Sequence, residues 1–274
     1  MNRICVILMS LLLASAACFA QEEAGLPQGK FYAKKGEVEG NYNFWIYTPG
    51  EYDSDPHSVP LVIFLHGASL CGNNLDRVRR YGVLDAIEKG KIIPAIVLAP
   101  QNSGGAWNAD KINGLLEWTK ANYRIDTTRI YVLGMSLGGY GTLDFVGKYP
   151  QKVAAAMALC GGCSLQDMDG LATVPLWIMH CEGDRAVSIS QSKRVADYLQ
   201  GKDADKLLRC SWLEKGSHGI LARLFYLQKT YDWLFAHSTA DSPRTVDKNF
   251  DIDYTDINQT YNELKWYKGM FDDD

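Results

Sequence analysis

The chain has 274 residues, of which 47% are hydrophobic, so it is long enough to bury one large core. Its formal net charge of −4 gives no general reason to expect nucleic acid or an anionic membrane surface as a partner. We therefore expect one globular domain that has no nucleic-acid partner and no obligatory membrane partner.

Residues 1–20 have the composition of a secretory leader. One arginine comes early, an apolar stretch runs from Ile4 to Leu13, and small residues lead up to Ala20. We expect cleavage after Ala20 and an exported, secreted or periplasmic chain. Lipid attachment at Cys18 is the alternative, which Ser15 disfavours because lipoprotein leaders usually carry a large aliphatic residue there.

Five cysteines follow the leader, so at least one thiol stays unpaired within a monomer. They are Cys71, Cys160, Cys163, Cys181 and Cys210. Cys160-Gly-Gly-Cys163 has the spacing of a redox or metal pair, but no second pair or histidine couple accompanies it. We therefore expect buried structural cysteines and no bound metal.

The first half of the chain alternates strand and helix patterns. A strand near Phe31 and the aromatic-polar alternation at 42–48 predict an antiparallel hairpin at a sheet edge. Apolar runs predict buried strands at 61–65 and 95–99, and apolar spacing predicts helices at 80–89 and 110–123. The alternation indicates an α/β fold.

The same alternation continues to residue 236. Strands are predicted at 130–133, 154–159, 175–179 and 207–213, and helices at 137–149 and 188–201. A last helix carries Leu224, Leu227, Tyr231, Leu234 and Phe235 on one stripe. Strands joined by helices predict a mostly parallel sheet with helices on both faces and ligands at the carboxyl ends of the strands.

The chain changes character after the α/β domain, which we place at residues 21–237. Residues 238–274 form an acidic extension rich in aromatic residues. Within it, Ile257, Tyr261 and Leu264 recur at helical spacing and predict one amphipathic helix that docks on the body.

One stretch indicates a nucleophile. The apolar run that ends at Leu133 is followed by Gly134-Met135-Ser136-Leu137-Gly138, which is the G-x-S-x-G pattern of a nucleophile elbow. A turn sharp enough to expose the Ser136 hydroxyl brings its neighbours against strand and helix, where a Cβ would clash. Glycine at positions 134 and 138 removes that clash.

A serine hydroxyl needs a base and a group that orients the base. His218 lies in a glycine-containing loop after the last strand, so we expect it to be the base. The acid should follow a strand between serine and histidine, and Asp184 fits that place. Glu182 is the competing acid.

An oxyanion hole needs two backbone N–H groups directed at the developing charge. One should belong to Leu137, directly after the nucleophile, and the other to Ala68 or Ser69 in the turn after the first buried strand. We expect His66 to hold that turn rather than to transfer a proton.

These motifs, in this order, resemble the α/β-hydrolase superfamily over residues 42–236. They are Leu65-His66-Gly67, Gly134-Met135-Ser136-Leu137-Gly138-Gly139, Asp184-Arg185-Ala186-Val187 and Gly216-Ser217-His218. The chain is most similar to secreted esterases of the feruloyl and acetylxylan type, and to dienelactone-hydrolase and prolyl-oligopeptidase-like catalytic domains. Cys181 and Ser188 depart from the pattern, where many relatives have glycine and proline.

The resemblance implies a serine carboxylesterase that needs no cofactor and acts on small or polysaccharide-linked esters of short or aromatic acids. The loop at 100–108 resembles one that walls the acyl pocket in such esterases, which makes Trp107 a candidate for substrate binding. Residues 162–174 contain no long insertion, so we expect no large lid. The alternatives are a small serine peptidase and an inactive glycan-binding module.

Overall fold

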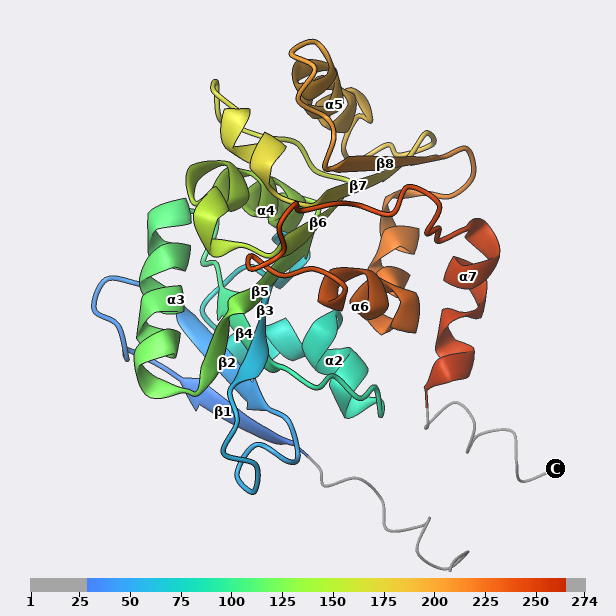
Figure 1. Ribbon diagram of the computed structural model, residues 1–274. Coiled ribbons are helices and arrows are strands. Elements are labelled where there is room, and N and C mark those ends of the chain that lie inside the picture. The colour runs from blue at the N-terminus through green and yellow to red at the C-terminus, as the bar shows by residue number, and fades with distance from the viewer. Residues whose placement is uncertain (1–28, 265–274) are drawn as a thin grey trace, which may run out of the picture.

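The computed structural model describes residues 29–264, and the predicted leader lies outside them. They form one eight-stranded sheet in the order β1-β2-β4-β3-β5-β6-β7-β8 (Figure 1). The strands are β1 (Lys30–Lys34), β2 (Asn43–Thr48), β3 (Val59–Leu65), β4 (Ile96–Gln101), β5 (Ile125–Met135), β6 (Ala155–Leu159), β7 (Leu176–Cys181) and β8 (Leu208–Leu213). The helices are α2 (Val83–Glu88), α3 (Ala109–Asn122), α4 (Leu137–Lys148), α5 (Ser190–Gln200), α6 (Gln228–Phe235) and α7 (Tyr254–Gln259). The predicted α/β fold is confirmed.

The first edge of the sheet is antiparallel and the rest is parallel. β1 pairs with β2 and β2 with β4 in antiparallel fashion, which confirms the predicted edge hairpin. Because the other strands run the same way, their carboxyl ends meet along one side of the sheet. The register places Met135 beside Leu159 and Cys181 beside Leu213. The segments that carry the predicted site residues all leave from these ends.

Helices lie on both faces of the sheet (Figure 1), and each face is covered by an apolar core. On one face, α2, α6 and α7 contribute to a core that includes Tyr131 and Trp177. On the other face, α3, α4 and α5 contribute to a core that includes Val132 and Phe145. Tyr131 and Val132 belong to opposite cores because side chains alternate along a strand. No helix within residues 29–264 combines the length and apolarity needed to span a bilayer.

The last predicted helix is divided in two. The 3-10 helix η5 (His218–Tyr226) and α6 are separated by Leu227, whose backbone is extended with φ −85° and ψ 131°. The prediction of one continuous stripe is therefore wrong at this residue. The Thr230 hydroxyl donates a hydrogen bond to the Leu224 carbonyl at 2.7 Å and fastens the two segments together. The break lets each segment bury its own apolar residues.

The described part of the C-terminal extension packs on the body. α7 begins with a capping box, in which Asp253 and Asp256 each accept the backbone N–H of the other. Ile257 and Leu264 are fully buried and belong to the core on the α6 side of the sheet. The predicted docking helix is confirmed over residues 254–259.

Candidate active site

Ser136 stands at a strained turn between β5 and α4. Its backbone has φ 58° and ψ −120°, and a residue with a side chain rarely adopts a positive φ. A Cβ added to Gly138 would lie 1.8 Å from the Leu65 carbonyl oxygen. One added to Gly134 would lie 2.3 Å from the Gly138 carbonyl oxygen. Both positions exclude a side chain, as the sequence predicted, and the half-buried Ser136 lies at the carboxyl end of the sheet.

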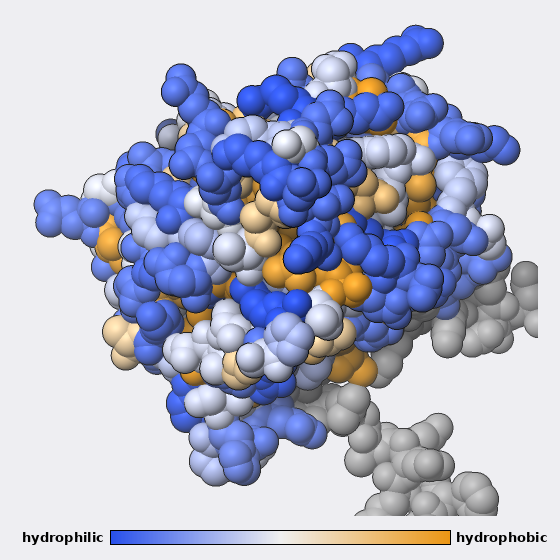
Figure 2. All heavy atoms as spheres, turned by 45° about the horizontal axis from the view of Figure 1, so that its top comes forward, coloured by the Kyte–Doolittle hydropathy of each residue, from blue (hydrophilic) through white to orange (hydrophobic). Residues whose placement is uncertain are grey.

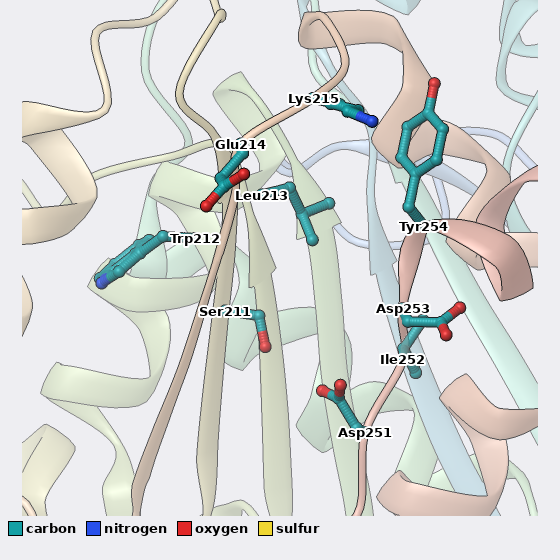
Figure 3. Close-up of a pocket in the computed structure, with 9 residues that line it drawn as sticks. All are labelled: Ser211, Trp212, Leu213, Glu214, Lys215, Asp251, Ile252, Asp253 and Tyr254. Carbon is teal, nitrogen blue, oxygen red and sulfur yellow. The ribbon is translucent and has the colours of Figure 1, made fainter.

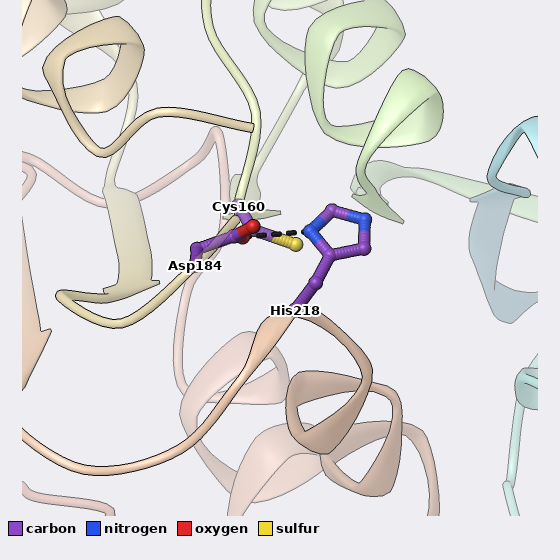
Figure 4. Close-up of side chains that lie close together, drawn as sticks. All are labelled: Cys160, Asp184 and His218. Carbon is purple, nitrogen blue, oxygen red and sulfur yellow. Dashed lines mark hydrogen bonds and ion pairs between the residues drawn. The ribbon is translucent and has the colours of Figure 1, made fainter. Parts of the chain in front are cut away.

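His218 and Asp184 come from neighbouring strand ends. Asp184 follows β7, and His218 follows β8 and opens η5. The His218 Nδ1 atom lies 2.6 Å from Oδ2 of Asp184, and Nε2 lies on the side of the ring away from the carboxylate (Figure 4). The Asp184 side chain is completely buried, whereas the His218 side chain is 24% exposed. One ring nitrogen is thus bound to the protein while the ring remains partly open to solvent.

The buried Asp184 carboxylate is satisfied by hydrogen bonds. Its Oδ1 accepts the backbone N–H groups of Ala186 at 2.8 Å and Val187 at 2.9 Å. Burial alone would raise the pKa of Asp184, but these N–H groups and His218 outweigh it and lower that pKa. An ionised Asp184 holds the proton of His218 on Nδ1, which leaves Nε2 as the basic nitrogen. Glu182, the competing acid, is exposed to solvent.

Two helices begin beside Ser136. Leu137 is the first residue of α4, and Ala68 and Ser69 open the 3-10 helix η1 (residues 68–70). N–H groups at a helix start have no acceptor within that helix, so they can bind an external oxygen. Gly67 lies against Ser136, since a Cβ placed on it would be 3.5 Å from Ser136 Cβ. The structure therefore brings the N–H groups predicted for an oxyanion hole close to Ser136.

His66 fixes the turn that carries Ala68 and Ser69. Its ring is fully buried, its Nε2 accepts the Asn102 N–H at 3.1 Å, and its Nδ1 lies 2.8 Å from the Gly67 carbonyl oxygen. This pattern assigns the proton to Nδ1, because an N–H group can only donate. Burial lowers the pKa of His66 to about 4, so the ring stays neutral. This is the holding role that the sequence predicted.

The structure corrects the pocket-wall prediction for Trp107. The side chain is only 5% exposed, and its indole N–H donates to the His66 carbonyl at 3.2 Å. Its ring packs edge-on against Tyr42 and His66, and a Cβ added to Gly141 of α4 would lie 2.7 Å from it. The absence of a side chain on Gly141 lets the indole fold inward beneath the His66 turn. Trp107 is therefore a packing residue.

Tyr81 borders the site, although no sequence pattern singled it out. Its phenol oxygen accepts hydrogen bonds from the Gly67 N–H and the Ser69 hydroxyl, each at 3.2 Å. A Cβ added to Gly67 would lie 2.9 Å from this phenol oxygen and 3.5 Å from Ser136 Cβ. The phenol and Ser136 therefore both lie next to Gly67. Burial raises the pKa of Tyr81, so the phenol stays protonated. Tyr81 thus fastens the turn at residues 67–69 on the side that faces Ser136.

Two further side chains border Asp184. The fully buried His180 places Nε2 3.2 Å from Oδ2 of Asp184. Three potential ligand atoms, one from each of Cys160, Asp184 and His218, lie within 4.8 Å of one another (Figure 4). Cys160 and Cys163 are both buried, as expected. Neither the cysteine spacing nor the apolar strand around His180 could indicate that these side chains meet the acid.

The segment between β6 and β7 packs in part against α4. Residues 160–175 include the 3-10 helix η4 (Asp169–Thr173), which packs against α4. A Cβ added to Gly170 would lie 2.2 Å from the Gly147 carbonyl oxygen, and Leu171 is 1% exposed. The η4 part of this segment is therefore packed on α4.

A separate groove of about 600 Å³ lies between β8 and residues 251–254 (Figure 3). It is lined by Ser211, Trp212, Leu213, Glu214, Lys215, Asp251, Ile252, Asp253 and Tyr254. None of the predicted site residues is among them. On the face shown in Figure 2, hydrophilic residues predominate and apolar residues appear in small areas. The described residues therefore form no broad apolar patch on the face shown in Figure 2.

The fold is that of the α/β-hydrolases, and the chain resembles that superfamily. A solved structure, a thermostable esterase, superposes with a TM-score of 0.65 and 25% identity, covering 77% of this chain and 63% of that one. No family model matches the chain.

Two curated proteins are similar to the chain in sequence. Acetylxylan esterase A of Emericella nidulans is 25% identical over 179 residues, which cover 57% of this chain and 56% of that protein. Poly(3-hydroxyalkanoate) depolymerase C of Paucimonas lemoignei is 24% identical over 174 residues, which cover 59% of this chain and 41% of that protein. The chain thus spans about half the length of the first relative and less of the second.

Replacing Tyr81 with phenylalanine tests its role as a positioning residue. Tyr81→Phe keeps the ring but removes the oxygen that accepts from Gly67 and Ser69. We expect kcat for an ester substrate to fall about 10-fold, less than the roughly 100- to 1,000-fold cost of losing a direct oxyanion donor. KM and the melting temperature should change little, because the phenol acts on the transition state through the turn.

The matched control is Tyr32→Phe on β1, where the tyrosine is 37% exposed. Its steady-state kinetics should equal those of the wild type. A raised KM with unchanged kcat in Tyr81→Phe would show that the phenol serves ground-state binding and would reject the positioning role.

Proposed function

We propose that the chain is a serine carboxylesterase that works by an acyl-enzyme mechanism without a cofactor. The observation that carries the proposal is the 2.6 Å pair of His218 and the buried Asp184, which follow β8 and β7 at the same edge of the sheet as the strained Ser136 turn. The similarity to a solved esterase and to acetylxylan esterase A supports the same reaction class. Three groups with these roles, on this fold, are suited to acyl transfer.

In the proposed reaction, Ser136 Oγ attacks the ester carbonyl carbon while Nε2 of His218 takes the hydroxyl proton. The N–H groups of Leu137 and of Ala68 or Ser69 stabilise the resulting oxyanion. His218 then gives the proton to the leaving alcohol. Asp184 stabilises the imidazolium throughout, and a water activated by His218 hydrolyses the acyl-enzyme.

Substitution of the two principal groups tests the mechanism. Ser136→Ala and His218→Ala should each lower kcat by about 10⁶-fold, since losses of this size follow removal of either group in a serine hydrolase. The double variant should be little worse than either single one, because groups that act as a unit are not additive. Turnover of an aryl acetate, with folding verified by circular dichroism, measures both. Wild-type activity in Ser136→Ala would end the proposal.

The assignment of the acid is tested separately. Asp184→Asn should lower kcat by about 10⁴-fold, because the amide favours the wrong imidazole tautomer. The matched control is Glu182→Gln, the same type of change at an exposed position two residues earlier, which should keep activity. The reverse result would reassign the acid.

We further propose that the acyl group is short and that the alcohol belongs to a polysaccharide. The packing of η4 against α4 and the lack of a long insertion in residues 162–174 support an open site, which suits a polymer-attached ester. The name of acetylxylan esterase A describes such a substrate. An aromatic acyl group is the second possibility, which the resemblance to feruloyl esterases suggested; the burial of Trp107 removes only the support that this residue gave it.

A panel of esters tests the acyl preference. We expect kcat/KM to fall as the acyl chain grows beyond about four carbons, since each added methylene would stay in water and forgo the ~0.8 kcal/mol of burial. Acetyl, butyryl, octanoyl and feruloyl esters of one alcohol, with acetylated xylan and a proline-containing peptide amide, form the panel. Best turnover of the octanoyl ester or of the peptide would contradict the proposal.

Export is the third part of the proposal, and it rests on the composition of residues 1–20. Cleavage after Ala20 should leave Gln21 as the first residue of the mature chain. Intact mass spectrometry of the protein from its native host measures this end directly. A lipid adduct on Cys18 would instead indicate a surface-anchored protein.

A further inference from the structure

Cys160 is held rigidly at the end of β6. Its backbone has φ 39°, a region that residues with a side chain seldom occupy and that costs of order 1–3 kcal/mol. Its N–H donates to the Met179 carbonyl at 2.8 Å, so the neighbouring strand fixes the position. Glycine would relieve the strain, yet a thiol stands there, fully buried. The sheet thus presents a sulfur atom at a fixed point beside the His218–Asp184 pair.

The three side chains form a mixed donor set. A thiol sulfur, an imidazole nitrogen and a carboxylate oxygen come from Cys160, His218 and Asp184, and these atoms lie within 4.8 Å of one another (Figure 4). Tetrahedral zinc has bonds of about 2.3 Å to sulfur and about 2.0–2.2 Å to nitrogen or oxygen, so its ligand atoms lie roughly 3.3–3.6 Å apart. Closing the set around one ion would require shifts of about 1 Å, in which the 2.6 Å hydrogen bond between His218 Nδ1 and Asp184 Oδ2 opens and the sulfur moves closer.

We propose that Cys160, Asp184 and His218 form an inhibitory site for a thiophilic divalent cation of the zinc class. Sulfur, imidazole and carboxylate are the ligands that zinc takes in proteins, and a water would complete four-coordination. The partly exposed His218 ring borders the site on the solvent side, whereas Asp184 is closed off. The cation therefore enters past His218.

A cation at this site would inhibit ester hydrolysis, because it would bind the imidazole that the reaction uses. This part of the inference rests on the proposed esterase function. When zinc binds Nδ1 of His218, the neutral ring carries its proton on Nε2, which can no longer accept the Ser136 proton. The Cys160 S–H bond breaks, its proton goes to solvent, and a zinc–sulfur bond forms, so one proton is released in total. Burial raises the pKa of the Cys160 thiol, so without the cation it remains protonated and unreactive.

The binding experiment does not depend on activity. The folded mature protein is titrated with Co²⁺ or Cd²⁺, whose bonds to thiolate give charge-transfer absorption, and with Zn²⁺ in competition. Wild-type protein should show the band, and Cys160→Ser should lose it. Cys160→Gly provides a second variant suited to the positive φ. The matched control Cys163→Ser removes another buried thiol of the same loop and should keep the band.

The kinetic experiment measures ester turnover against Zn²⁺ concentration, each variant normalised to its own rate with chelator present. Even changes outside the ligand shell weaken metal binding about 10- to 100-fold, so loss of the sulfur should raise the inhibitory concentration at least 100-fold. Chelator should restore wild-type turnover. Equal zinc sensitivity in wild type, Cys160→Ser and Cys160→Gly would overturn the proposed cation site. So would active wild-type enzyme that shows no thiolate charge-transfer band with Co²⁺ or Cd²⁺. An inactive protein that shows the band would instead refute the esterase proposal alone.

Discussion

A buried negative charge organises the proposed site. The Asp184 carboxylate has no exposed surface, and an unpaired charge in such a place would cost several kcal/mol. Backbone N–H groups of Ala186 and Val187 satisfy one oxygen, while His218 and His180 approach the other. The carboxylate therefore stays ionised, and the imidazole is bound in one tautomer. The arrangement of the loop after β7 follows from this need to satisfy the charge.

The parallel sheet supplies the common edge on which these loops meet. β5, β6, β7 and β8 are adjacent and in register, so the residues that follow them are neighbours although they are far apart in sequence. Ser136, Cys160, Asp184 and His218 come from four successive strands in that order. A shift of any one strand by a residue would turn its side chains to the opposite face. Packing on both faces of the sheet thus fixes the geometry of the site.

Sequence patterns could predict the parts of the site that depend on local structure. The glycines around Ser136 are required by contacts within one strand-turn-helix unit, and the order of Ser136, Asp184 and His218 follows the strand order. Tyr81, His180 and Cys160 could not be predicted, because their roles depend on distances between loops. Trp107 was misjudged for the same reason. Its direction depends on Gly141 of another element, which leaves room for the indole inside the fold.

Backbone strain at two neighbouring strand ends shows how the sheet supports the site. Ser136 and Cys160 both have positive φ, and each conformation costs of order 1–3 kcal/mol unless the surroundings enforce it. The Ser136 N–H donates to the Leu159 carbonyl, and the Cys160 N–H donates to the Met179 carbonyl, both at 2.8 Å. These bonds continue the interstrand pairing one residue beyond β5 and β6. Hydrogen bonds of the sheet therefore support both strained turns, and the backbone of Ser136 and of Cys160 is fastened to the neighbouring strand.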